Sequence, residues 1–423
     1  HGVTDKDNKI KEPFLYSTSF HQNCLWLYNE YLETLKRENL EDFDGILQVA
    51  ICKLEAGNDY FRKYDVTGQL KDLEFIFIDE FQDFSILFNN LVQEILKLTP
   101  NVNLFCVGDD WQAINGFAGA DLMFFQKFNN FIKNGKQLYL KKNYRSKQSI
   151  VDIGNSLMNG LGEPAIANHL DYGEIYLVNT EDYEPTLIEN QFHKNDITTP
   201  IIIRLIQNTL HTSDCNVVLL SRKNKVTVNG GIDFAHLKSI NQYAKADNET
   251  KNYLKLIQSF FKQEDANRIF ISTTHKYKGL EKDVVIVLDA LESNYPFIHP
   301  NWFFTSIFED SIEKIFDAER RLFYVALTRA IHKLYLVTEY SKQSTFLKDI
   351  VKNGFKLNSI NIKEQLHFDY SHLCNQNAYI AIKNSPMIST GGTIPIKSIL
   401  TEVGYKYIPS HKSWVKSVNL KKP

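Results

Sequence analysis

Residues 75–85 read Phe-Ile-Phe-Ile-Asp-Glu-Phe-Gln-Asp-Phe-Ser, so an apolar run leads directly into a cluster of acids. An unbroken apolar run of this length predicts a parallel strand that is buried on both faces. Its acids would emerge at the carboxyl edge of the sheet, where open α/β sheets bind their ligands. The adjacent carboxylates Asp79 and Glu80 suit a site for a magnesium nucleotide, but a strand that ends in a solvated acidic turn has the same pattern.

A second strand with a polar end is predicted at 103–107, and it is also expected to be buried. Apolar residues at helical spacing predict an amphipathic helix over 86–98, which Pro100 ends. The second strand delivers Gly108, two aspartates, Trp111 and Gln112 at its carboxyl end. Strand, helix and strand in this order form a βαβ unit, which aims both polar ends at one site.

Phe117 lies in a loop beside Gly116 and Gly119, which let the backbone turn sharply. A ring presented on such a loop can stack on a base of single-stranded nucleic acid, a contact worth about 1–3 kcal/mol. The same ring could instead anchor the loop in the core. The residues alone leave both interpretations open.

Polar groups follow three further predicted elements. A strand over 137–142 leads to Arg145 and a helix from Gln148, so Arg145 could meet a phosphate or pair with a surface acid. A strand over 268–272 leads into residues 273–281, whose hydroxyl, His and Lys groups suit a nucleic-acid backbone, a nucleotide or a solvated turn. A helix over 311–330 carries Arg329 near its end, where an arginine can complement the helix dipole or act as an arginine finger.

The remaining pattern predicts helices in the first 60 residues, strands at 216–220, 283–288 and 333–338, and a helix over 251–262. Residues 160–200 are expected to be irregular or peripheral, and Gly230-Gly231 predicts a turn. Residues 404–416 interleave aromatics with lysines. That mixture is typical of a small nucleic-acid module or of a folded mini-domain with a lysine-rich face.

Composition narrows the class of protein. The 423 residues carry a formal net charge of -2, which excludes a bulk polycation, so any contact with nucleic acid must come from local patches. The five cysteines are scattered without a Cys-x-x-Cys spacing, as expected for reduced thiols. No run approaches the roughly 18 apolar residues of a membrane span, and the first residues lack a signal-peptide pattern. We therefore expect a soluble, cytoplasmic protein.

Five blocks, taken in order, resemble the UvrD/Rep-type superfamily 1 DNA helicases, and within them the helicase IV-like branch. The blocks are Ile78–Asp83, Gly108–Ile114 with Gly119–Asp121, Asn143–Ser146, Thr274–Lys276 with Lys278–Glu281, and Glu319–Ala330. Each block is a weak signal alone, but five in the right order are highly specific.

The resemblance implies an α/β fold of the RecA-like (P-loop NTPase) type, with parallel sheets flanked by helices and ATP between two such domains. Residues 1–135 would be a partial first RecA-like domain with N-terminal helices. Residues 136–345 would be the second, with its regulatory insertion reduced or absent, because only about 50 residues separate Arg222 from Thr273. Residues 346–423 would form a C-terminal accessory module.

The resemblance also implies roles in ATP hydrolysis for five side chains. Asp79 is similar to the ligand of Mg²⁺, and Glu80 to the base that positions the attacking water. Gln112 resembles the sensor of the γ-phosphate that couples nucleotide state to the loop of the DNA-binding aromatic. Arg145 and Arg329 resemble the two arginines that stabilise charge on the transferred phosphate.

Further residues are implied to hold the nucleotide or the DNA. Tyr144 is similar to the residue that stacks on adenine, and Glu281 to the residue near the ribose. Phe117, Thr274 and His275 are similar to contacts with the DNA strand. The loop around Phe117 reads Asn-Gly-Phe-Ala and lacks an arginine that relatives often carry there, which puts one phosphate contact in doubt.

The family's phosphate-binding loop has no counterpart, since no Gly-x-x-x-x-Gly-Lys-Ser/Thr occurs in the 423 residues. Without that loop the β- and γ-phosphates lose their amide cradle and lysine, so we expect this chain alone to bind ATP poorly and hydrolyse little. One explanation is that His1 lies inside a longer protein whose first portion carries the loop. The other is a degenerate relative that does not hydrolyse ATP.

The function implied by the resemblance is that of an ATP-dependent helicase or translocase. It would use ATP and Mg²⁺ and move 3′-to-5′ on single-stranded DNA or on single-strand/double-strand junctions. The alternative is a non-catalytic DNA-binding or scaffold relative that has lost the phosphate loop.

Overall fold

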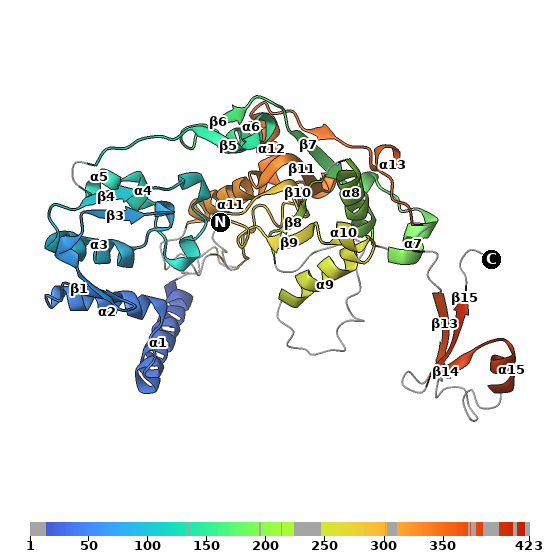
Figure 1. The fold of residues 1–423 in the computed structure, drawn as a ribbon, viewed down its shortest axis with the longest axis horizontal. Helices are drawn as coiled ribbons and strands as arrows, with labels where there is room; N and C mark the ends of the chain where they lie inside the picture. Colours follow the sequence, from blue (N-terminus) through green and yellow to red (C-terminus); the bar gives the residue numbers. More distant parts are fainter. Residues whose placement is uncertain are drawn as a thin grey trace, which may run out of the picture.

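The computed structural model describes residues 14–132, 135–193, 196–212, 214–223, 247–300, 302, 311–370, 373, 378–383, 397–408 and 413–418. The predicted turn at Gly230-Gly231 lies outside these residues. Figure 1 shows an N-terminal lobe (residues 14–132), a central lobe (142–370) and a separate C-terminal sheet (378–418).

The N-terminal lobe begins with helices, as predicted, and then forms two small sheets. Its elements are α1 (Phe14–Glu38), α2 (Phe43–Glu55), β1 (Tyr60–Lys63), β2 (Val66–Gln69), β3 (Phe75–Ile78), α3 (Ile86–Leu98), β4 (Asn103–Cys106), α4 (Met123–Gln126) and α5 (Phe128–Phe131). Short 3-10 turns at Leu70–Asp72, Phe81–Asp83, Asp110–Gln112 and Gly116–Ala118 connect them. Ser85 caps α3 by accepting a hydrogen bond from the amide of Phe88, which explains why the helix starts there.

Strands β3 and β4 pair in parallel across α3, which confirms the predicted βαβ unit. The prediction that both strands are buried on both faces is wrong. Ile78, Leu104 and Cys106 pack toward a core built around Phe81, Phe84, Val92 and Phe124, whereas Phe75, Phe77 and Phe105 are exposed. Among the described residues the pair has no third strand, so only the face under the helices is covered.

The central lobe is built on a six-stranded sheet in the order β12-β7-β11-β10-β8-β9, and all of its pairings are parallel. The strands are β7 (Glu174–Asn179), β8 (Val217–Ser221), β9 (Ile269–Thr273), β10 (Lys282–Val287), β11 (Ala330–Thr338) and β12 (Asn358–Ser359). The helices are α6 (Gln148–Leu157), α7 (Leu187–His193), α8 (Thr198–Thr212), α9 (Asp247–Gln258), α10 (Gln263–Ala266), α11 (Ile312–Leu327), α12 (Thr345–Lys352) and α13 (Ile362–Gln365). Two further 3-10 turns lie at Thr180–Asp182 and Tyr340–Lys342.

Both faces of this sheet are covered by helices (Figure 1). Val218 and Leu220 of β8 enter the core beneath α6, α11 and α12, while Val217 and Leu219 enter the core beneath α8 and α9. Successive side chains of a strand point to opposite faces, so a continuous apolar strand is what a doubly covered sheet requires. The predicted α/β class, with parallel sheets flanked by helices, is confirmed.

Two secondary-structure predictions fail in the central lobe. Residues 160–200 are not peripheral, because they contain β7, which lies inside the six-stranded sheet beside β11. The strand predicted at 137–142 is displaced: β5 spans Lys142–Lys147 and pairs with β6 (Ile166–His169), while Leu138 and Leu140 are exposed. Apolar alternation cannot produce a strand where the described fold offers no partner strand.

The last part of the chain contributes to the central lobe and to a separate C-terminal sheet. Residues 346–370 pack with the central lobe, because α12 contributes Phe346 and Leu347 to one core and β12 pairs with β7. The predicted boundary at 345 placed them in a separate module. A three-stranded antiparallel sheet follows in the order β13-β15-β14, from β13 (Ala378–Lys383), β14 (Lys406–Ile408) and β15 (Ser413–Val418), with α15 (Lys397–Glu402) beside it.

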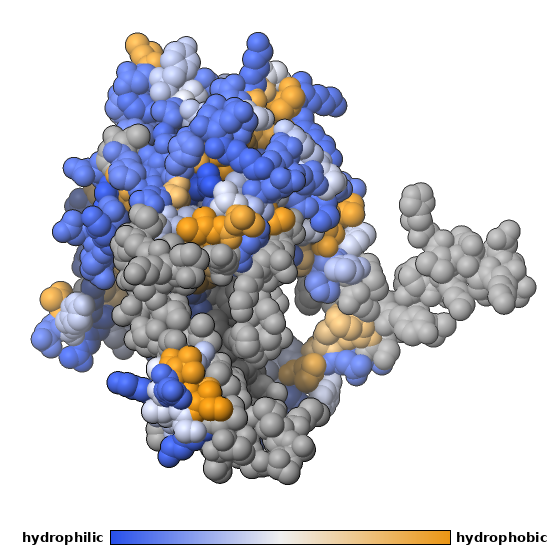
Figure 2. All heavy atoms as spheres, turned by 90° about the vertical axis from the view of Figure 1, so that its right-hand side faces the viewer, coloured by the Kyte–Doolittle hydropathy of each residue, from blue (hydrophilic) through white to orange (hydrophobic). Residues whose placement is uncertain are grey.

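The surface shown in Figure 2 is mostly hydrophilic, and its apolar side chains form small separate groups. No helix among the described residues is long and apolar enough to cross a lipid bilayer.

The uneven covering of the two sheets predicts different costs for trimming strand residues. Ile286 is fully buried in β10, so Ile286→Ala should lower the free energy of unfolding by about 2–5 kcal/mol, because it removes packed atoms and leaves a cavity. Phe77→Ala, at a strand position that is 72% exposed, should cost about 0.5 kcal/mol or less. Denaturant titrations of the two variants would measure both values, and equal losses would contradict this description of the sheets.

Candidate functional site

Asp79 and Glu80 directly follow β3, at the carboxyl edge where the sequence places them. The amide of Glu80 donates to Oδ1 of Asp79 at 2.9 Å. Glu80 adopts φ 52° and ψ 41°, the left-handed region that a residue with a Cβ rarely occupies. Such backbone persists only where its surroundings hold it, and it concentrates at functional sites.

Gln82 holds this turn against the end of β4. Its side chain is buried, its Nε2 donates to the carboxylate of Glu80, and its Oε1 accepts from the amide of Asp109 at 2.9 Å. Gly108 is required here, because a Cβ at that position would lie 2.6 Å from Oε1 of Gln82. The two acidic strand ends are therefore joined by one amide side chain.

Asp83 joins three segments that are distant in sequence. Its Oδ2 accepts from Nδ2 of Asn115 at 2.8 Å and pairs with Nζ of Lys278 at 2.6 Å. Lys278 also lies 3.4 Å from Oε2 of Glu80. Within the part of the chain that the structure describes, Oδ1 of Asp83 is buried without a hydrogen-bond partner, and Lys278 of the central lobe is the cation that pairs with this carboxylate.

Arg329 lies just beyond α11 and is 1% exposed. Its Nε donates to the carbonyl of Val325 at 3.1 Å, and its Nη1 donates to the carbonyl of Leu280 at 3.2 Å. Its Nη2 donates to Oε1 of Gln112 at 3.2 Å, and Gln112 in turn donates to Oδ2 of Asp109 at 2.6 Å. Gln112 and Arg329, which sequence assigned separately, are thus in contact across the two lobes.

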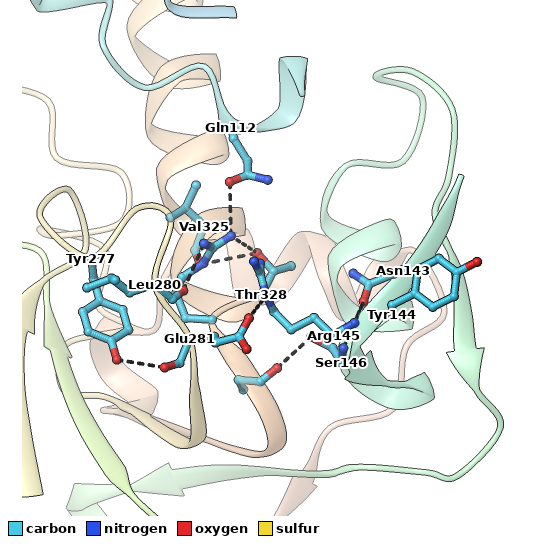
Figure 3. A network of polar contacts seen from close by, with 12 residues as sticks. Gln112, Asn143, Tyr144, Arg145, Ser146, Tyr277, Leu280, Glu281, Val325 and Thr328 are labelled. Carbon is cyan, nitrogen blue, oxygen red and sulfur yellow. Dashed lines mark hydrogen bonds and ion pairs between the residues drawn. The ribbon is translucent and has the colours of Figure 1, made fainter. Parts of the chain in front are cut away.

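Arg145 lies on β5, whose end is fixed by the hydroxyl of Ser146 donating to the carbonyl of Ala330 at 2.8 Å. The Arg145 guanidinium pairs with the carboxylate of Glu281. Figure 3 shows this pair beside Thr328, with the ring of Tyr144 turned away from the network. That ring is exposed, so its face is accessible to a planar ligand.

The site carries a local excess of positive charge around Arg329. Burial is the main cause that lowers the pKa of Arg329 to about 10, and the neighbouring charge of Arg145 lowers it further. An anion would stabilise the charge of Arg329, and the fork geometry of an arginine matches phosphate oxygens. The residues present therefore fit the phosphate groups of a nucleotide.

The acidic side of the site fits a hard cation only with help from other ligands. Among the described residues, no three His, Cys, Asp or Glu side chains are grouped to hold a metal ion. Mg²⁺ retains water and binds one or two carboxylates together with phosphate oxygens. Asp79 could supply one such carboxylate.

Phe117 is 81% exposed on its 3-10 turn, so the interpretation of this ring as a core anchor is wrong. Its ring meets that of His275 from the central lobe edge to face, with centroids 6.0 Å apart. Burial is the main cause that lowers the pKa of His275 to about 4, and Arg222 adds to it. His275 is therefore neutral near pH 7, and it offers a ring and a hydrogen-bonding nitrogen rather than a charge.

Thr274 is placed differently from Phe117 and His275. It is fully buried, and its hydroxyl bonds to that of Tyr295 at 2.7 Å. Its amide donates to the carbonyl of Ser221 at 3.0 Å. This placement gives Thr274 a part in holding the segment of His275, and it does not support a direct contact between the hydroxyl and DNA.

Several residues of the site lie in the five blocks, but the sequence assigned them no role. Gln82, Asp83 and Lys278 all lie inside the quoted blocks, yet only the structure brings them together. The signal in the sequence was that Lys278 and Asp83 lie in two blocks that are both expected at the nucleotide site. Trp111 offered a second signal, since a large ring between acids and an amide must find a partner to be buried.

Two family profiles match the chain. The profile of the UvrD/REP helicase N-terminal domain matches residues 4–133, and the profile of the UvrD-like helicase C-terminal domain matches residues 233–341. Together they cover more than half of the chain.

Individual relatives agree with the profiles. A probable DNA helicase of Mycoplasma pneumoniae is 28% identical over 356 residues, which cover 81% of this chain and 58% of that protein. DNA helicase IV of Escherichia coli is 26% identical over 335 residues, which cover 75% of this chain and 40% of that protein. The chain thus spans about half the length of these relatives. The solved C-terminal domain of a possible DNA helicase from Lactobacillus plantarum aligns at 17% identity with a TM-score of 0.28, over 49% of this chain and 94% of that chain.

The ion pair of Lys278 and Asp83 predicts a measurable contribution to stability. Lys278→Gln removes the cation from a mostly buried carboxylate and should lower the free energy of unfolding by about 1–3 kcal/mol, between the values of exposed and fully buried pairs. Lys363→Gln, which breaks an exposed pair with Glu184, is the matched control and should cost about 0–1 kcal/mol. Chemical denaturation near pH 7 measures both, and a Lys278 variant as stable as its control would contradict the contact.

Proposed function

This chain belongs to the UvrD/Rep family of DNA helicases, and we propose that it forms part of an ATP-dependent motor that moves along single-stranded DNA. The observation that supports this most is the contact between Gln112 of the N-terminal lobe and Arg329 of the central lobe. A nucleotide that met both lobes at this point would couple its own state to the angle between them.

In this proposal the N-terminal lobe supplies the carboxylates of the reaction and the central lobe supplies the arginines. ATP supplies a phosphoanhydride bond whose hydrolysis releases free energy. Asp79 would hold Mg²⁺, and a carboxylate oxygen of Glu80 would take a proton from the attacking water. Arg145 and Arg329 would hold the negative charge of the phosphate, with Gln112 hydrogen-bonded between the lobes.

The remaining nucleotide contacts are assigned by the family resemblance and supported by exposure. The accessible ring of Tyr144 would stack on the adenine. Glu281, half exposed beside Arg145, would face the ribose. We propose that both residues act from the central lobe, as part of a second RecA-like domain over residues 136–345 against which residues 346–370 also pack.

DNA would bind where Phe117 and His275 meet, since these rings come from different lobes. An exposed ring can stack on any base, so the grip would be tolerant of sequence. Thr274 would support His275 from below through its bond to Tyr295. The 3′-to-5′ direction is proposed from the family alone.

Hydrolysis also requires a phosphate-binding loop, and these 423 residues do not contain its sequence motif. The proposal therefore concerns the full-length protein that contains this chain, with residues 1–135 as part of its first RecA-like domain. One observation favours the alternative of a non-hydrolysing DNA-binding relative. Glu80, the proposed base, is already engaged by Gln82 and lies 3.4 Å from Lys278.

The exposed ring of Phe117 predicts a loss of DNA affinity on truncation. Phe117→Ala should weaken binding of this chain to oligo(dT) by about 5- to 150-fold, because base stacking on one ring is worth about 1–3 kcal/mol. Phe43→Ala, at an equally exposed phenylalanine on α2, is the matched control and should leave the affinity unchanged. Fluorescence anisotropy at one fixed salt concentration compares the two. Unchanged affinity of the Phe117 variant would remove this ring from the DNA site.

A measurement of ATP hydrolysis distinguishes the proposed motor from the non-hydrolysing scaffold. In the full-length protein, Glu80→Gln should reduce the kcat of DNA-stimulated ATP hydrolysis by at least about 100-fold, since general-base catalysis contributes about 10²–10⁴-fold. Binding of a fluorescent ATP analogue should persist in this variant. Near-normal turnover would exclude Glu80 as the base, and a wild-type protein that binds DNA without any turnover would establish the scaffold.

A further inference from the structure

Trp111 belongs to the N-terminal lobe by sequence, yet its ring lies in the core of the central lobe. It is 5% exposed and clusters with residues of α6 and α11. The ring packs edge to face on Tyr324 with centroids 5.2 Å apart, and its Nε1 donates to the carbonyl of Leu161 at 2.5 Å. A Cβ at Gly162 would lie 3.0 Å from this nitrogen, so the pocket closely surrounds the indole.

The neighbours of Trp111 are held in the same place. Ile114, three residues on, is also 5% exposed within this core. Between them, Gln112 accepts the hydrogen bond from buried Arg329. Trp111, Gln112 and Ile114 therefore contact the central lobe, although β4 and the acids after β3 belong to the other lobe.

The two ends of this segment are bonded back to the turn of Asp79 and Glu80. The amide of Asp109 donates to Gln82, which also contacts the carboxylate of Glu80. Nδ2 of Asn115 donates to Asp83 at 2.8 Å. All three hydrogen bonds are partly buried, but the Trp111 end is fixed in addition by a ring packed against Tyr324 in the central core. When the angle between the lobes changes, the hydrogen bonds to Gln82 and Asp83 should therefore rearrange before the indole leaves its pocket.

We propose that Trp111 is a positioning residue that fastens residues 109–115 to the central lobe. A change of the angle between the lobes is then transmitted through Gln82 and Asp83 to the turn that carries Glu80. The same motion reaches Phe117, which follows Asn115 in the chain. A role of this coupling in catalysis rests on the proposed function, but the mechanical coupling itself does not.

The test uses this chain without nucleotide or DNA, so its outcome is independent of the proposed activity. Hydrogen exchange is measured on peptides that cover residues 75–84 and 105–115, in wild type and in Trp111→Ala. Spin labels on unnatural amino acids at exposed Gln126 and Lys352 report the distance between the lobes. We expect the variant to broaden the distance distribution and to speed exchange of both peptides at least about tenfold.

Two further variants separate positioning from general loosening. Phe124→Leu disturbs the N-terminal core, where Phe124 is 1% exposed, and should leave the distance distribution unchanged. Trp111→Phe keeps a packed ring but loses the bond to Leu161, and it should restore most of the wild-type distribution. If Trp111→Ala does not fold, Trp111→Leu replaces it under the same criteria. A wild-type distribution in the Ala or Leu variant, or equal broadening in Phe124→Leu, would overturn the proposal.

Discussion

The burial of Arg329 is the constraint around which the two lobes meet. A guanidinium that is 1% exposed must find acceptors for its donors, and it finds them in the carbonyls of Val325 and Leu280 and in the amide of Gln112. The first two acceptors come from the central lobe and the third from the N-terminal lobe. Satisfying one buried cation therefore requires the two lobes to lie in one particular relation.

Charge is distributed unevenly around this contact. The neighbouring charge of Arg145 lowers the pKa of Arg329 further than burial alone does, and Arg145 itself pairs with Glu281. On the acidic side, Lys278 crosses from the central lobe to Asp83 and approaches Glu80. Asp79, Glu80 and Asp83 thus lie on one lobe and Arg145 and Arg329 on the other, and Lys278 of the central lobe contacts the acids of the N-terminal lobe. This separation suits a ligand that carries both phosphate and a divalent cation.

Local sequence predicted much of this accurately where the decisive interactions are themselves local. The helix α3, the parallel pair of β3 and β4 and the position of Asp79 and Glu80 all depend on residues within one βαβ unit. The prediction failed where partners come from elsewhere. Phe75 and Phe77 have apolar side chains but no covering layer among the described residues, and residues 137–140 have strand-like alternation but no neighbouring strand in the described fold.

The sequence by itself determined the family, the order of the five blocks and the chemical groups available to the site, because these follow from residue identity and spacing. Only the tertiary structure decided which of those groups meet. It buried Thr274 and exposed Phe117, it brought Lys278 to Asp83, and it placed Trp111 in the core of the other lobe. The physical reason is that burial and pairing depend on packing between distant segments, as in the contact of Gln112 with Arg329, which are 217 residues apart. No local pattern encodes such packing.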